Sequence, residues 1–81
     1  MRQPMQDETE IDAIGLLCPL PVLKARKALG TLPEGAVLRL LASDPAAIVD
    51  VPHFCAQSGH EFPDLREASD HVVYRLRKGP S

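Results

Sequence analysis

The sequence has few aromatic residues, two cysteines and little net charge. Aromatic residues make up 4% of its 81 positions and tryptophan is absent, whereas apolar residues as a whole make up 44%. Aliphatic side chains must therefore supply most of the packing. A chain of this length forms one small domain with a thin core. The formal net charge of −2 gives no reason to expect strong direct nucleic-acid binding.

Long apolar runs are also missing. None approaches the roughly 20 residues needed to cross a bilayer, so no membrane partner is expected. The N-terminal segment MRQPMQDETE is polar and lacks the hydrophobic stretch of a signal peptide. Cys18 and Cys55 lie far apart and do not make a disulfide framework. These absences together predict a cytoplasmic protein with both thiols reduced.

The remaining pattern alternates strands and helices. Residues 1–7 predict a flexible tail, followed by a single domain over residues 8–79. Period-two alternation or short apolar runs predict four strands, at residues 9–13, 36–42, 60–67 and 71–78. Helical spacing predicts two helices, at residues 19–29 and 45–58. The order strand-helix-strand-helix-strand-strand predicts an α/β two-layer sandwich, with a four-stranded mixed sheet and two helices on one face.

Prolines and glycines mark irregular points in this plan. Asp44 is placed to cap the second helix, with Pro45 at its first position and Gly59 at its end. Pro52 falls inside that helix and must kink it or restart it. Pro63 indicates that the third strand lies at a sheet edge or contains a bulge.

The segment CPLP, residues 18–21, predicts a rigid helix start with a sulfur atom at its tip. A residue before proline is pushed toward extended backbone, which is what an N-cap requires, so Cys18 is predicted at the N-cap. Pro19 and Pro21 then take the first and third helical positions. Neither loses a hydrogen bond there, because the first amides of a helix have no intrahelical partner.

This position predicts reactive chemistry for Cys18. The positive end of the helix dipole, with Lys24 and Lys27 just beyond, predicts an accessible thiol with a depressed pKa. A dithiol redox motif needs a second cysteine three residues on, where the chain has Pro21. A modification on Cys18 would thus persist until another molecule removes it, as in a carrier. The alternative is a cysteine that serves as a small buried hydrophobe.

Other candidate residues indicate structure rather than chemistry. Cys55 shares a helix face with Ile48 and Val51 and is predicted in the core. No metal site is expected, because four possible ligands lack any recognised spacing: His53, Cys55, His60 and His71. No cofactor is expected either. A solvated outer sheet face, or alternatively a weak RNA or protein contact, is predicted for three arginines: Arg39, Arg75 and Arg77.

Asp12, Gly15 and the CPLP segment together resemble the signature of the TusA/SirA-like sulfur-carrier family. Four downstream segments resemble its second-helix pattern: Ser43-Asp44-Pro45, Asp50-Val51-Pro52, Phe54-Cys55 and Gly59-His60. The resemblance spans residues 9–78, nearly the whole chain. It implies a two-layer α/β sandwich and a protein that carries sulfane sulfur.

The resemblance also implies roles for particular residues. Cys18 would accept sulfur as a persulfide from a cysteine desulfurase or a rhodanese-like donor and pass it to a downstream acceptor protein, in some members toward tRNA thiolation. Such a protein is a sulfurtransferase-type carrier with a covalent persulfide rather than an independent turnover enzyme. Five residues are implied to support the helix start: Asp12, Gly15, Pro19, Leu20 and Pro21. Three are candidates for partner contact: Leu20, Lys24 and Lys27.

Two points stay open at the level of sequence. The family often has an arginine between its strand aspartate and glycine, where this chain has Ile14, and that exchange bears on which partners bind. The second function class is a non-catalytic regulatory or interaction domain, in which Cys18 senses redox state or is incidental. The carrier requires Cys18 to be exposed with a low pKa, whereas the regulatory domain requires neither.

Overall fold

A computed structural model describes residues 8–80, and the tail predicted for residues 1–7 lies outside the described residues. The chain forms β1 (Thr9–Ala13), α1 (Leu20–Leu29), β2 (Val37–Ala42), α2 (Ala47–Ser58), β3 (Glu61–Glu67) and β4 (Val72–Arg77). The predicted order of elements is therefore confirmed.

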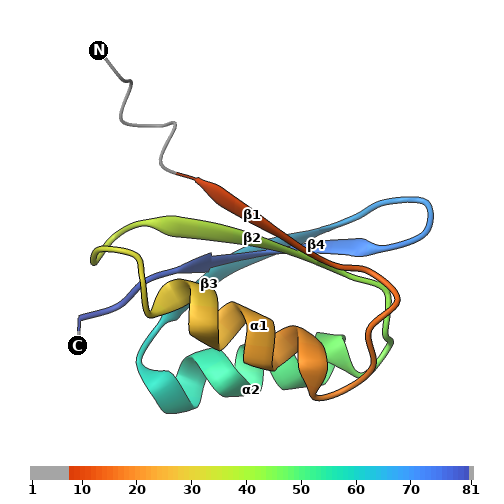
Figure 1. The fold of residues 1–81 in the computed structure, drawn as a ribbon, viewed down its shortest axis with the longest axis horizontal. Coiled ribbons are helices and arrows are strands. Elements are labelled where there is room, and N and C mark those ends of the chain that lie inside the picture. The colour runs from red at the N-terminus through yellow and green to blue at the C-terminus, as the bar shows by residue number, and fades with distance from the viewer. Residues whose placement is uncertain (1–7, 81) are drawn as a thin grey trace.

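The four strands form one mixed sheet in the order β1-β2-β4-β3. β1 and β2 are parallel, and α1 is the crossover between them, while β4 runs antiparallel to both β2 and β3. Both helices lie on the same side of the sheet (Figure 1). This is the predicted two-layer sandwich.

The core lies between the sheet and the two helices, because each element buries one face. Period-two alternation turns four side chains of the central strands inward: Leu38, Leu40, Tyr74 and Leu76. The helices bury the residues that face them: Ala25, Leu29, Ala47, Val51 and Cys55. Apart from Tyr74, small and aliphatic residues thus fill the interior, as the scarcity of aromatic residues requires.

The topology brings two connections to one end of the sheet. Because β1 and β2 are parallel, their C-terminal ends lie side by side. The connections that follow them, residues 14–19 before α1 and residues 43–46 before α2, therefore leave the sheet at the same end (Figure 1). Gly15 makes the first turn with a φ of 87°, in the left-handed region that glycine adopts without strain. This end of the sandwich therefore contains both helix starts and the Cys18 segment.

The proline predictions have mixed outcomes. Pro63 lies in the edge strand β3, where the register shifts between Glu61 and Asp64, so the predicted edge and bulge are confirmed. The predicted start of α2 at Pro45 is wrong: Pro45 lies in a turn, and the helix begins at Ala47. α2 continues through Pro52 without a restart and ends at Gly59, whose φ of 78° is left-handed, as predicted for a helix stop.

Candidate functional site

Local hydrogen bonds fix the segment that leads from β1 to Cys18. The Asp12 carboxylate accepts a hydrogen bond from the Ile14 backbone N–H at 2.9 Å. The Gly15 N–H donates to the Ser43 hydroxyl at 2.9 Å, which ties this segment to the β2–α2 connection. The predicted supporting residues Asp12 and Gly15 thus shape the turn, and Ser43 joins the two loops.

Two aspartates from the second half of the chain hold Cys18. The Cys18 backbone N–H donates to Asp44 Oδ2 at 2.6 Å, and its Sγ donates to Asp50 Oδ2 at 2.7 Å. Asp44 also accepts from the Ala46 N–H at 3.2 Å, so both of its oxygens are engaged. Cys18 remains exposed to solvent, as predicted.

The predicted cap position of Cys18 is wrong by one residue. α1 begins at Leu20 with Pro19 as its N-cap, no side chain caps the helix, and Pro21 is buried in its first turn. The Leu20 N–H donates to the Leu17 carbonyl at 2.8 Å, which closes a turn across Cys18. The Cys18–Pro19 peptide bond is cis. Cys18 does not cap α1, because its amide is bonded to Asp44 in the β2–α2 connection and its thiol is bonded to Asp50 in α2.

The pKa of Cys18 is raised, which corrects the predicted depression. The largest cause is the hydrogen bond that the thiol donates to Asp50, followed by partial desolvation and by the negative charges of Asp50 and Asp44. Ionising the thiol would lose that bond and place an anion beside two carboxylates. The resting form of Cys18 is therefore the protonated thiol.

The lysines of α1 do not counteract the effect of Asp44 and Asp50 on the pKa of Cys18. Lys24 and Lys27 line a surface groove of about 370 Å³ between β1 and α1, together with Thr9, Ile11, Ala28 and Thr31. The charged groups that shift the pKa of Cys18 are both acidic. Leu20, a candidate for partner contact, shares a helix face with the two lysines and is 47% exposed.

Apolar side chains surround the Cys18 segment. Six large hydrophobic residues are exposed among residues 8–80: Ile14, Leu17, Leu20, Leu23, Ile48 and Val49. The first four lie on the β1–α1 connection and the first turn of α1, and the other two lie in the first turn of α2. We call these six residues the apolar rim. Leu17 is 68% exposed directly beside Cys18. These residues leave apolar surface exposed at the end of the sheet where both helices begin.

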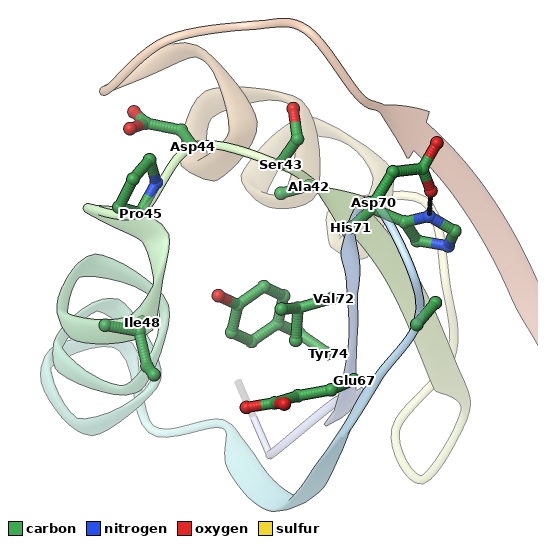
Figure 2. A pocket seen from close by; sticks show the side chains of 11 residues that line it. Ala42, Ser43, Asp44, Pro45, Ile48, Glu67, Asp70, His71, Val72 and Tyr74 are labelled. Atoms are coloured by element: carbon green, nitrogen blue, oxygen red, sulfur yellow. Dashed lines mark hydrogen bonds and ion pairs between the residues drawn. The ribbon is translucent and has the colours of Figure 1, made fainter.

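A pocket of about 350 Å³ adjoins the same loops (Figure 2). Ser43, Asp44 and Pro45 form one wall, Ile48 lies on α2, and the ring of Tyr74 lies in the middle of the view. Glu67, at the end of β3, and the hydrogen-bonded Asp70–His71 pair, from the β3–β4 connection, complete the polar lining. Three of the lining side chains are carboxylates: Asp44, Glu67 and Asp70. Most of the other lining residues are apolar, and Asp44 is the lining residue that also binds the Cys18 backbone.

Cys55 and the arginines lie where the sequence predicted, although Ile48, predicted to share the face of Cys55, is 51% exposed. Cys55 is 1% exposed, burial raises its pKa to about 11, and it is a free thiol, like Cys18. Arg39 and Arg75 face each other across β2 and β4 on the outer side of the sheet, and Arg77 follows. All three form ion pairs there, with Glu8, Glu10, Asp64 and Glu61. These arginines are therefore held away from the helix side of the sheet.

Membrane-spanning and metal-binding features are both absent from residues 8–80. No helix in this range is long and apolar enough to span a bilayer. No cluster of three or more His, Cys, Asp or Glu side chains in this range is arranged to hold a metal ion.

Sequence reasoning missed three residues of the site: Ser43, Asp44 and Asp50. The sequence predicts Asp44 as a helix cap and, like Asp50, as part of a family-like segment, but it does not predict that either residue contacts Cys18. The sequence nevertheless contains a signal for these residues. Polar side chains occur in Ser43-Asp44-Pro45 and Asp50-Val51-Pro52, just after β2 and at the start of α2, and β2 runs parallel to β1. Side chains at such strand ends meet at one edge of the sheet.

The chain is similar to known proteins over nearly its full length. A family model described as sulfurtransferase TusA matches residues 9–78. The sulfur carrier protein TusA of Pseudomonas syringae pv. syringae is 36% identical over 81 residues, covering 96% of either chain. The sulfur carrier protein TusA of Allochromatium vinosum is 37% identical over 71 residues, or 88% of this chain and 93% of its own. The crystal structure of a SirA-like protein from Desulfitobacterium hafniense superimposes with a TM-score of 0.77 at 27% identity, covering 89% of this chain and 99% of that one.

Proposed function

Because the chain belongs to the TusA sulfurtransferase family and is a sulfur carrier, we propose that Cys18 carries the sulfur as a persulfide. The observation that supports this most strongly is the difference in access between the two thiols. Cys18 is exposed at the end of the sheet where both helices begin, whereas Cys55 is enclosed in the core. An incoming sulfur donor can reach only the first without unfolding the domain, which we take to span residues 8–79.

The proposed reaction is an exchange at sulfur. The Cys18 sulfur attacks the terminal sulfur of a persulfide on the donor protein, forming a new S–S bond as the donor's own S–S bond breaks. The Cys18 proton ends on the departing donor thiolate. The product is a persulfide on Cys18 and a thiol on the donor, so no external oxidant or reductant is needed. The same exchange in the opposite sense passes the sulfur to an acceptor.

The donor class that fits this chemistry is a protein that forms a cysteine persulfide, either a cysteine desulfurase or a rhodanese-like protein. The acceptor is another protein, in a relay toward tRNA thiolation or a different sulfur pathway. The apolar rim supports protein partners, because its exposed apolar side chains near the reacting sulfur would be removed from water when a partner docks. We further place the carrier in the cytoplasm, where its thiols stay reduced.

Mass spectrometry of the intact protein tests this function. After incubation with a cysteine desulfurase and cysteine, the protein should gain the mass of one sulfur atom, removable by a reducing agent. Peptide mapping should place that sulfur on Cys18. Sulfur found on Cys55, or no gain from desulfurase and rhodanese-like donors alike, would count against the proposal. Oxidation of Cys18 by peroxide without any sulfur loading would instead support the redox-sensing alternative.

A further inference from the structure

We propose that Asp50 is a positioning residue for sulfur transfer: it holds the Cys18 thiol protonated in the free carrier and releases it when a cationic group beside the donor's sulfane sulfur pairs with the Asp50 carboxylate. This inference rests on the proposed function, since it assigns Asp50 a part in the loading of Cys18. It also specifies a chemical feature of the donor.

The two aspartates at Cys18 are engaged differently. Asp44 receives two backbone N–H groups, one on each oxygen, so its place is structural. Asp50 accepts the thiol on Oδ2, in the first turn of α2. The Asp50–Cys18 contact can therefore be exchanged for another partner without breaking the loop, whereas the Asp44 contact cannot.

The free carrier supplies no cation at this place. Within residues 8–80 neither Asp44 nor Asp50 forms an ion pair, whereas Arg39, Arg75 and Arg77 are paired on the outer face of the sheet. The first turn of α1, residues 20–23, carries no charged side chain. The charged groups that act on the thiol are thus Asp50 from α2 and Asp44 from the β2–α2 connection.

A thiol in this setting is a poor nucleophile, because thiolate is the reactive form and both neighbours oppose it. A cation that pairs with Asp50 removes the hydrogen-bond acceptor and neutralises one of the two opposing charges. The proton then leaves with the donor's thiolate as the new S–S bond forms. A donor with a lysine or arginine beside its persulfide fits the two carboxylates at Cys18.

Alkylation of Cys18 by iodoacetamide across a pH range tests the first half of the proposal. Asp50→Asn should move the midpoint of alkylation to lower pH, because the carboxylate that favours the protonated thiol is gone. Asp64→Asn is the matched control: it removes one negative charge from the outer face of the sheet, where Asp64 pairs with Arg75, and should leave the midpoint unchanged. Equal midpoints for wild type and Asp50→Asn would overturn the role of Asp50.

Two disulfides of opposite charge test the second half. Cystamine carries ammonium groups near its sulfur atoms, and dithiodipropionate carries carboxylates, so their rates of mixed-disulfide formation report the charge that Cys18 prefers. The wild type should react faster with cystamine. That preference should fall on the order of threefold in Asp50→Asn and be retained in Asp50→Glu. An unchanged preference in folded Asp50→Asn would refute a cationic partner.

Wild-type protein supplies a measurement that does not depend on how the variants fold. Raising the salt concentration should reduce its preference for cystamine, because exposed charges are screened. A preference that salt does not alter would also contradict the proposal. Neither disulfide tests sulfur loading, so a carrier that prefers cystamine but takes no sulfur from any donor would disprove the proposed function alone. A carrier that loads sulfur without the charge preference would disprove the role of Asp50 alone.

Discussion

Cys18 and Cys55 have the same side chain, and both have a raised pKa, but the largest cause differs between them. Cys18 is exposed and its proton is held by the Asp50 carboxylate, whereas Cys55 is buried and its ionisation is opposed by desolvation. A hydrogen bond to a surface carboxylate can be exchanged when a partner docks, but burial ends only when the domain opens. If Cys18 carries the sulfur as proposed, what distinguishes it from Cys55 is a reversible restraint on its proton, and not a low pKa.

The largest expected effect comes from Cys18→Ser, which should abolish sulfur loading completely. A hydroxyl cannot form a persulfide. It can still donate to Asp50, and the site is exposed, so the midpoint of urea denaturation should stay close to that of the wild type. Intact mass after incubation with donor and cysteine, together with urea denaturation, measures both quantities. Sulfur still carried by this variant would show that Cys18 is not the cysteine that carries it.

The pKa of Cys55 gives a stability effect with a definite sign. In the unfolded chain the thiol loses its proton near the ordinary cysteine pKa of 9.0, whereas in the folded protein it keeps the proton up to about 11. Its contribution is therefore fully present below pH 9.0 and is lost as the pH rises to about 11, by about 2–3 kcal/mol in all. Urea denaturation across this range should show the decline, and Cys55→Ala should make it smaller; the part that remains comes from Cys18 and Tyr74, whose pKa values are also raised. Equal pH slopes for the two proteins would contradict the enclosed position of Cys55.

Cys55→Ser is the counterpart of Cys18→Ser. It places a hydroxyl in a site that is 1% exposed, within the cluster formed with Val51 and Ala47, so the free energy of unfolding should fall by about 1–3 kcal/mol. Sulfur loading of Cys18 should persist at temperatures where the variant is folded. A variant that is as stable as wild type but cannot be loaded would reverse the assignment of the two thiols.

The fold could be predicted from the sequence because its signals are local. Alternation in β4 turns Tyr74 and Leu76 inward, helical spacing buries Ala25 and Leu29, and Gly59 ends α2 in the left-handed conformation. Each of these patterns depends on residues a few positions apart. Helix starts are less predictable, since α2 begins at Ala47, after the turn that contains Pro45.

The site was only half predictable, because its decisive contact is not local. The exposure of Cys18 before a helix follows from the CPLP segment, but its bond to Asp50 joins residues 32 positions apart. The predicted pKa had the wrong direction for the same reason. The helix start is worth about half a positive charge, whereas two full carboxylates arrive from the neighbouring loop and helix. Only the pairing of parallel strands β1 and β2 brings them together.

The turn that presents Cys18 can be tested through Gly15. Its φ of 87° is unfavourable for other residues, although a Cβ there would meet nothing within 4 Å. Gly15→Ala should therefore lower the free energy of unfolding by about 1–2 kcal/mol through backbone strain alone. Gly30→Ala is the matched control. Gly30 has a right-handed φ of −62°, so this variant should lose less free energy of unfolding than Gly15→Ala. Equal stability of the two variants would show that the Gly15 turn relaxes freely.

The smallest effect is expected from Lys24→Glu, which separates the thiol environment from the partner surface. Lys24 lies in the groove between β1 and α1 and is not among the groups that shift the pKa of Cys18, so the pH midpoint of Cys18 alkylation should not change. Asp50→Asn, in contrast, should lower that midpoint. Slower sulfur uptake from a protein donor by Lys24→Glu, at an unchanged midpoint, would identify Lys24 as a partner contact. A midpoint that rises in Lys24→Glu would mean that α1 does act on the thiol, and that the two carboxylates are not its only charged neighbours.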